Sequence, residues 1–303
     1  MDVSVIMVSY NTRDMLRDAL VSLRAKTSGV EYEVIVVDNG SEDGSVAMLR
    51  AEFPDVRVIE SGGNIGFGRA NNLGFEAARG EFCFLLNTDT LLVNNAVALL
   101  RDHMRSYPEV GACGANLCRR NLVPTFSYGR LPRRSDILYQ FVPAFLGRSG
   151  RKKNYCQGGD PRPVGYVTGA DMMVRAAVVR EVGGFDPDFF MYAEEIELSC
   201  RITRAGWRID VVPEARIIHF GGGAQPSEVA LRRRQLSVYI LYRKLYGKAY
   251  VGLFHLACQI RCSLRWLAAT VTGRRAQMRR FSRQFSINRD AFRKYRNQLC
   301  TIR

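Results

Sequence analysis

The chain has 303 residues, of which 47% are hydrophobic and 24% charged, with a net charge of +15; this composition is typical of a globular protein rather than a disordered or fibrous one. Its eight cysteines form no Cys-x-x-Cys pair and no zinc-like cluster with histidine, so we expect reduced thiols and no zinc site. No basic leader precedes the first apolar run, and the apolar stretch 249–271 contains a histidine and two arginines, which argues against a secreted or membrane-spanning protein.

Apolar runs and amphipathic segments alternate along the first hundred residues. Four continuous apolar runs predict buried strands, and each is followed by a segment with apolar residues at helical spacing. This alternation predicts βαβ units and a mostly parallel sheet flanked by helices, which is the α/β class. The predicted strands cover residues 3–9, 32–38, 56–60 and 81–87, and the predicted helices cover residues 12–26, 43–53, 67–79 and 95–106.

Short polar clusters follow all four predicted strands. The carboxyl ends of parallel strands meet at one edge of a sheet, and ligands bind beyond that edge in open α/β sheets. Each cluster alone is explained by turn chemistry, because Asp and Asn are common turn residues. Four clusters at one edge favour a binding site. The clusters are Ser9-Tyr10-Asn11, Asp38-Asn39-Gly40-Ser41, Gly62-Gly63-Asn64 and Asn87-Thr88-Asp89.

The glycine-rich segment 62–68 matches neither of two common phosphate-binding loops. It lacks the third glycine of the dinucleotide fingerprint, since Asn71 stands at that position, and the chain has no Gly-x-x-x-x-Gly-Lys-Ser/Thr sequence. NAD-dependent oxidoreductases and P-loop NTPases are therefore disfavoured. Asp38 could accept hydrogen bonds from a nucleotide, and Asp89 could hold a divalent cation, Mg²⁺ or Mn²⁺, that bridges two phosphates.

Three glutamates open a further predicted helix. Acids in a first turn favour the helix dipole, and Glu197 is spaced to pair with Arg201, so helix stability explains Glu197. An apolar aromatic run precedes Glu194 and Glu195 and predicts a partly buried site that raises the pKa of a carboxyl group, where a general base could act. Farther along, His219 ends an apolar run before three glycines. A lone histidine is more often structural, but imidazole there could complete a metal site.

The positive charge is concentrated in residues 225–303, which carry 18 Lys and Arg against two acidic residues, whereas residues 1–224 carry 26 against 27. We therefore divide the chain into a domain of residues 1–224 and a basic region of residues 225–303. Apolar residues recur at helical spacing in the basic region, beside arginines and aromatic residues. This pattern predicts amphipathic helices in the interface of an anionic membrane. Helices that pack on the first domain are the main alternative, and nucleic-acid binding is disfavoured because the region is too apolar for phosphate tracking.

Several of these segments resemble family 2 glycosyltransferases with the GT-A fold, and most closely their rhamnosyltransferase-like branch. The resemblance covers residues 3–223, and the order and spacing of its motifs make it specific; the basic region matches only in general character. The segments that carry it are VSYN (8–11), VVDNGS (36–41), GNIGFGRANN (63–72), LLNTD (85–89), TGA (168–170), VGGFD (182–186) and YAEEIEL (192–198).

The resemblance implies a nucleotide pocket at the strand ends. Asp38 would contact the pyrimidine base of a UDP- or dTDP-linked sugar. Asp89 matches the last acid of the family's Asp-x-Asp motif and would bind the metal, while Asn87 replaces the first acid and weakens its contact to ribose or metal. The other residues implied in nucleotide binding are Ser9, Tyr10, Asn11, Asn64, Gly66, Arg69, Asn72 and Thr88.

The resemblance also implies the catalytic groups. The family's Glu-Asp pair, whose Asp is the base, appears here as Glu194-Glu195, so Glu195 inherits that role. Its side chain is longer by one methylene and must place the carboxylate differently, which leaves Glu194 as an alternative base. His219 matches the family's late histidine that binds the metal.

The activity implied by the resemblance is inverting transfer of a sugar, for which the family suggests rhamnose, from a nucleoside diphosphate sugar to a hydroxyl group with the help of Mg²⁺ or Mn²⁺. The acceptor would be a saccharide on a polyprenyl diphosphate in cell-surface polysaccharide synthesis. The basic region would then attach the protein peripherally to the cytoplasmic face of the cell membrane. Two alternatives stay open: a sugar nucleotidyltransferase, and a non-catalytic protein that binds nucleotide sugars or nucleic acid.

Overall fold

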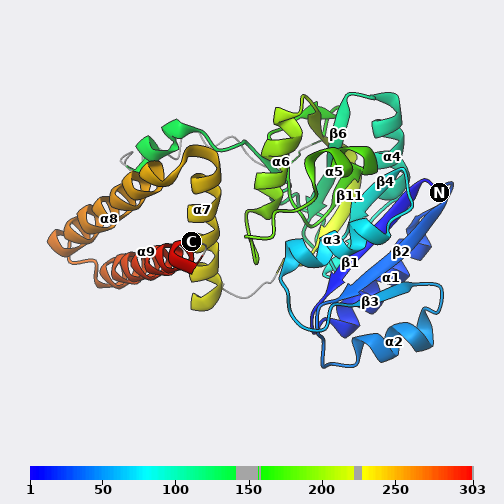
Figure 1. Cartoon of the computed structure of the whole chain (residues 1–303), viewed down its shortest axis with the longest axis horizontal. Coiled ribbons are helices and arrows are strands. Elements are labelled where there is room, and N and C mark those ends of the chain that lie inside the picture. Colours follow the sequence, from blue (N-terminus) through cyan, green and yellow to red (C-terminus); the bar gives the residue numbers. More distant parts are fainter. Residues whose placement is uncertain (141–155, 157, 222–226, 302–303) are drawn as a thin grey trace. The chain divides into compact units, whose positions relative to one another are not determined.

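The computed structural model of the chain describes residues 1–140, 156, 158–221 and 227–301 (Figure 1). These residues fall into two compact units. The predicted boundary between residues 224 and 225 lies outside the described residues. The first unit comprises the described residues within Met1–Leu131, Lys153–Phe190 and Glu194–Gly223, and the second comprises those within Pro132–Lys152, Met191–Ala193 and Ala224–Arg303.

A mixed sheet of nine described strands forms the centre of the first unit. Its strands are β1 (Val3–Ser9), β2 (Tyr32–Asp38), β3 (Arg57–Glu60), β4 (Phe82–Leu85), β5 (Thr90–Leu92), β6 (Val110–Cys118), β8 (Arg162–Pro163), β10 (Met172–Arg175) and β11 (Arg208–His219). The order is β3-β2-β1-β4-β10-β6-β11-β5, and β8 pairs with β11. The four strands β1 to β4 are parallel, as are β6 and β11, whereas β10 runs antiparallel between β4 and β6. A separate ribbon pairs β7 (Tyr128–Gly129) with β9 (Tyr166–Val167).

Helices cover both faces of the sheet. They are α1 (Arg13–Lys26), α2 (Ser45–Glu52), α3 (Phe67–Ala77), α4 (Ala96–Ser106), α5 (Ala176–Val182) and α6 (Glu194–Arg204). In β1, Val5 and Met7 face the core that contains buried residues of α1, α2 and α4, while Ile6 between them faces the core of α5 and α6. Because side chains alternate across a strand, cover on both faces explains why β1 is a continuous apolar run. The predicted α/β architecture is confirmed.

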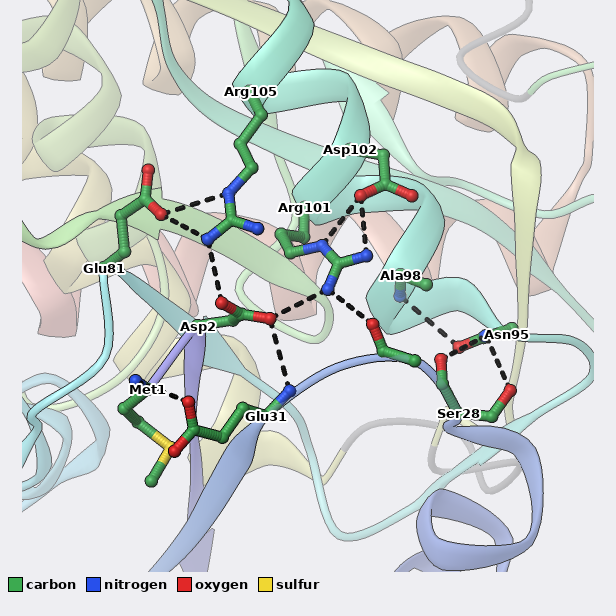
Figure 2. A network of polar contacts seen from close by, with 11 residues as sticks. Met1, Asp2, Ser28, Glu31, Glu81, Asn95, Ala98, Arg101, Asp102 and Arg105 are labelled. Atoms are coloured by element: carbon green, nitrogen blue, oxygen red, sulfur yellow. Dashed lines mark hydrogen bonds and ion pairs between the residues drawn. The ribbon is translucent and has the colours of Figure 1, made fainter.

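A charged network closes the amino edge of the sheet (Figure 2). Asp2 precedes β1 and binds Arg101 and Arg105 of α4, each at 2.8 Å. Arg105 also binds Glu81, just before β4, at 2.6 Å. The hydrogen bond from Arg105 is the main cause that lowers the pKa of Asp2 to about 2. These ion pairs tie two strand starts to α4, and the polar clusters predicted to bind a ligand lie at the opposite, carboxyl edge.

The second unit is helical in its described part. Its elements are the 3₁₀ helix η1 (Arg134–Gln140) and the helices α7 (Glu228–Tyr246), α8 (Lys248–Val271) and α9 (Arg275–Thr301). Tyr239 of α7 is fully buried and packs edge-on against Phe254 of α8 and Phe292 of α9. Its hydroxyl lies 2.9 Å from Nδ1 of His255. The prediction that the basic region is helical is confirmed. None of the described helices combines the length and apolarity that crossing a bilayer requires.

Candidate functional site

The first two strands bring their terminal polar residues side by side. Ser9 of β1 and Asp38 of β2 are partners in the parallel register. The Oδ2 atom of Asp38 accepts hydrogen bonds from the amides of Gly40 and Ser41 at 3.2 and 3.0 Å. The Oδ1 atom is buried and has no hydrogen-bond partner among the described residues. A buried acceptor left unpaired is costly, so Oδ1 is a position where a ligand's donor group would bind.

The loop after β1 is fastened to the loop after β2. The amide of Asn11 donates to Oγ of Ser41 at 3.0 Å, and Oδ1 of Asn11 accepts from the amide of Glu42 at 2.8 Å. Asn11 has a φ of 53°, a conformation that Asn tolerates better than most residues. Tyr10 is exposed beside it. The segment Ser9-Tyr10-Asn11 therefore lies against the Asp38 loop.

The glycine-rich loop is linked to the loop after β2 through Asn39. The side-chain amide of Asn39 donates to Oδ1 of Asn64 at 3.2 Å. The same Asn64 oxygen accepts the amide of Gly66 at 3.2 Å. Gly66 has a φ of 93°, and a Cβ there would overlap the carbonyl oxygen of Phe190. That oxygen accepts the amide of Phe67 at 2.9 Å. Glycine at this position thus lets the loop reach residue 190, four residues before the glutamate pair.

Arg69 and Asn72 hold the segment that leads to the glutamates. Nε of Arg69 donates to the carbonyl of Pro187 at 3.0 Å. The side-chain amide of Asn72 donates to the Phe185 carbonyl and accepts the Phe185 amide, both at 2.8 Å. Direct contact of these two residues with a nucleotide stays a prediction, and the structure gives them a positioning role for residues 185–187.

Asp89 and His219 lie together where β5 meets the end of β11. His219 is the register partner of Thr90, and its Nε2 atom lies 3.2 Å from Oδ1 of Asp89. Burial alone would raise the pKa of Asp89, but the hydrogen bond and charge of His219 outweigh it and lower that pKa. For His219 the two effects have the opposite signs. Burial lowers the pKa of its imidazole, and the hydrogen bond and charge of Asp89 raise that pKa by more. Asp89 is therefore ionised at neutral pH and able to bind a cation.

The donor set of Asp89 and His219 fits a divalent cation. Mg²⁺ and Mn²⁺ bind carboxylate oxygens, usually with only one or two carboxylates from the protein and the remaining positions taken by water and substrate phosphates. The described residues contain no group of three or more His, Cys, Asp and Glu side chains that could hold a metal by itself. A cation held here by two protein ligands would thus keep positions open for a pyrophosphate.

Residues 168–171 link the cation pair to the glutamate pair. The carbonyl of Ala170 accepts the amide of Asn87 at 3.0 Å. A Cβ built on Gly169 would lie 3.7 Å from Cβ of Glu195. One short segment therefore hydrogen-bonds to the loop 87–89 and lies beside the start of α6. The metal-binding and catalytic candidates gather in one region of the carboxyl edge.

The glutamate pair stands at an unusual backbone turn. Tyr192 and Ala193, the two residues before α6, have φ values of 73° and 66°, which side-chain-bearing residues adopt rarely and mostly where function requires it. Glu194 is 5% exposed, and its Oε2 atom has no hydrogen-bond partner among the described residues. Burial, followed by the charge of Glu195, raises the pKa of Glu194 to about 8. Glu194 is therefore largely protonated at neutral pH, while Glu195 is only half-buried.

Glu197, the third glutamate, has a structural role. Its carboxylate binds Arg201 at 2.7 Å with the predicted i,i+4 spacing. The Arg201 guanidinium also donates to the carbonyl of Gly184 at 2.6 Å. The pair thus anchors α6 to the chain that follows α5.

A family model described as Glycosyl transferase family 2 matches residues 4–183, which is more than half of the chain. The chain belongs to this family. It is a glycosyltransferase, and its family membership sets aside the sugar nucleotidyltransferase and the non-catalytic binding protein that the sequence alone left open.

Curated relatives and a solved structure agree with this membership. The N-acetylglucosaminyl-diphospho-decaprenol L-rhamnosyltransferase of Mycobacterium tuberculosis is 28% identical over 71% of this chain and 75% of its own length. Rhamnosyltransferase WbbL of Escherichia coli is 26% identical over 72% of this chain and 83% of its own length. Mannosyltransferase PcManGT from Pyrobaculum calidifontis, solved in complex with GDP-Man and Mn²⁺, shares the fold with a TM-score of 0.62 at 17% identity, over 97% of this chain and 86% of that one. The predicted GT-A fold and likeness to the rhamnosyltransferase-like branch are confirmed.

One buried residue near the candidate site, Asp171, was not predicted from the sequence. Asp171 is fully buried and accepts the amide of Ala115 at 2.7 Å and the hydroxyl of Thr168 at 2.9 Å. Burial raises its pKa to about 7, against the opposing effects of these hydrogen bonds and of the nearby His219. The available signal was a charged residue at the entrance of an apolar run, one position after the TGA motif.

The raised pKa of Glu194 predicts how stability depends on pH. The unfolded chain releases this proton near pH 4.5 and the folded chain near pH 8, so between these values the folded state holds more protons and loses stability as pH rises. Glu194→Gln removes this loss, so we expect the Tm of the variant, relative to wild type, to increase from about pH 5 to about pH 8. The raised pKa of Asp171 affects the stability of wild type and variant alike, so its contribution cancels in the difference between their Tm values. A Tm difference that is equal at both pH values would contradict the buried, protonated state of Glu194.

Proposed function

We propose that this glycosyltransferase moves a sugar, with rhamnose as the first candidate, from a UDP- or dTDP-linked donor to a hydroxyl of a saccharide carried on a polyprenyl diphosphate, with inversion at the anomeric carbon. The observation that carries the proposal is that residues 168–171 bind the loop 87–89 through Ala170 and lie beside Glu195. The name of the mycobacterial relative supports the acceptor class, because that protein acts on a decaprenol-linked saccharide.

The nucleotide would bind at the ends of β1 and β2. Asp38 would accept a hydrogen bond from the pyrimidine base through its unpartnered Oδ1 atom. Ser9, Tyr10 and Asn11 would line the pocket from the loop after β1, and the loop 62–66 would close it from the other side. Asn87 and Thr88 would lie along the ribose and phosphates.

Asp89 and His219 would hold the divalent cation. When bound, the cation supplies Lewis-acid stabilisation for the negative charge on the departing nucleoside diphosphate. Asp89 is ionised at neutral pH, and Nε2 of neutral His219, 3.2 Å from Oδ1 of Asp89, would be the second protein ligand. Asn87, which carries no charge, would contribute only a neutral amide beside it.

Glu195 would act as the general base. The acceptor hydroxyl must lose its proton as its oxygen attacks the anomeric carbon, and the bond to the nucleoside diphosphate breaks on the opposite face, which inverts the configuration in one step. A base must be unprotonated and within reach of the substrate; Glu195 is half-buried, whereas Glu194 is buried with a pKa of about 8. Glu194 would stay neutral and so avoid placing a second negative charge beside the base.

Residues 1–224 would form the catalytic domain, and residues 225–303 would attach it peripherally to the cytoplasmic face of the cell membrane, where a polyprenyl-linked acceptor lies. The strongly basic charge of residues 225–303 supports this division.

A thermal-shift panel of UDP- and dTDP-sugars, with GDP-sugars as the purine-linked comparison and each with and without Mn²⁺, tests the donor assignment. A pyrimidine nucleoside diphosphate sugar should raise the Tm, because a ligand that binds only the folded state stabilises that state. Mn²⁺ should make this rise in Tm larger. Stabilisation by purine-linked sugars alone would contradict the assignment of Asp38 to a pyrimidine base.

A further inference from the structure

An apolar stripe runs along one face of α8. Its six residues recur at steps of three and four, so they lie on one line along the helix. Each is between 39% and 82% exposed, and at 1.5 Å per residue the stripe is about 27 Å long. The stripe consists of Leu253, Leu256, Ile260, Leu264, Leu267 and Val271.

The other face of α8 already packs within the second unit. Val251, Phe254, Cys258 and Cys262 are each at most 5% exposed, and Phe254 packs against the ring of Tyr242 with 4.6 Å between centroids. The stripe is therefore not used to hold the helices together. A contiguous exposed apolar surface of this length marks an interaction site rather than ordinary protein surface.

The charges around the stripe point to an anionic partner. α8 has no acidic residue, and it carries Arg261 and Arg265. Among the described residues of α7, α8 and α9, the two acids Glu228 and Asp290 both bind Arg232, at 2.6 and 3.1 Å. The acidic groups thus lie on α7 and α9, and none lies on the helix with the stripe.

The chain directly after α8 adds more positive charge. Four exposed arginines stand between residues 274 and 280, at the start of α9. A second copy of the chain would bring an equally basic surface against this one, and like charges would repel. A bilayer with anionic headgroups offers both an apolar layer for the leucines and phosphate groups for the arginines.

We propose that the stripe on α8 docks onto the surface of a bilayer that contains anionic lipids, with the helix lying in the plane of the interface. The leucines enter the boundary between headgroups and acyl chains, and the arginines at 274–280 bind lipid phosphates. This inference rests on the proposed function, since it specifies how the protein reaches a membrane that holds a polyprenyl-linked acceptor.

Vesicle flotation of the full chain tests the docking face. It compares neutral vesicles of phosphatidylcholine with anionic vesicles that also contain phosphatidylglycerol. The double variant Leu256→Asn/Leu264→Asn should lower the partition onto the anionic vesicles at least about tenfold, because two exposed leucines that would enter the bilayer interface are replaced by polar amides. Leu138→Asn removes an equally exposed leucine on η1, outside the stripe, and should bind as wild type does. Wild-type affinity of the double variant, or equal wild-type binding to neutral and anionic vesicles, would overturn the inference.

Two further measurements separate the inference from its competitors. Sedimentation of the full chain without lipid should give the same mass for wild type and double variant; a wild-type dimer that the double variant converts to a monomer would assign the stripe to a second copy and overturn the inference. Transfer to a short-chain, water-soluble acceptor should be unchanged by the double variant. If the wild type shows no transfer, the proposed function is contradicted but the docking of the stripe is not, because flotation tests the docking face independently.

Discussion

Replacing Glu195 with glutamine is expected to lower kcat by about 10²–10⁴-fold while leaving the Kd for the donor sugar nucleotide unchanged. Glutamine keeps the shape of the side chain but cannot take the proton of the acceptor hydroxyl. Steady-state turnover on a lipid-linked acceptor measures the loss, and calorimetric titration of the donor measures the binding. A variant that keeps more than a tenth of wild-type turnover would remove Glu195 from the role of base.

Glu194→Gln is the matched control, because it makes the same change one residue earlier. Glu194 is buried with a pKa of about 8, so its neutral form already resembles glutamine at neutral pH. We expect turnover of this variant to stay within a few-fold of wild type. If Glu194→Gln abolishes turnover and Glu195→Gln does not, the two glutamates exchange roles.

Asp89→Asn is expected to abolish the effect of Mn²⁺ on donor binding, with a rise in Kd of at least about tenfold in the presence of the metal. The substitution keeps the size of the side chain but removes the negative charge that binds the cation and pairs with His219 at 3.2 Å. Calorimetric titration of the donor with Mn²⁺ and with a chelator measures both affinities.

Asp18→Ala, which removes an exposed carboxylate on α1, is the control for Asp89→Asn and should retain the full response to Mn²⁺. The affinity measured in chelator should be similar in all three proteins, since Asp38 and its neighbours are unchanged. An undiminished response to Mn²⁺ in Asp89→Asn would place the cation elsewhere.

The parts of the fold that could be predicted are the elements that a local sequence pattern marks. β1 and β2 span the predicted residues because a continuous apolar run, bounded by polar residues, is typical of a strand covered on both faces. The predicted strand 81–87 is too long: β4 ends at Leu85, and Asn87 leaves the sheet to bind Ala170. The insertion of β10 between β4 and β6 was not predicted, since pairing between segments so far apart in sequence leaves no local pattern.

The site was predictable in its residue types more than in its contacts. The aromatic run before the glutamates predicted a buried, pKa-raising position, and Glu194 confirms it. Nucleotide binding by Asn72 and Arg69 stays a prediction, whereas their hydrogen bonds to backbone carbonyls more than a hundred residues away were not predicted. Asp171 was missed because a buried carboxyl stabilised by Ala115 and Thr168 depends on a fold that brings those residues together.

The most direct test of the account is analysis of the product that the wild-type chain forms from a UDP- or dTDP-sugar, Mn²⁺ and a polyprenyl-diphosphate-linked saccharide. We predict a lipid-linked product longer by one sugar, with the anomeric configuration opposite to that of the donor, and one nucleoside diphosphate released for each sugar transferred. Retention of the donor's configuration, or release of the sugar to water with every donor and acceptor offered, would contradict it.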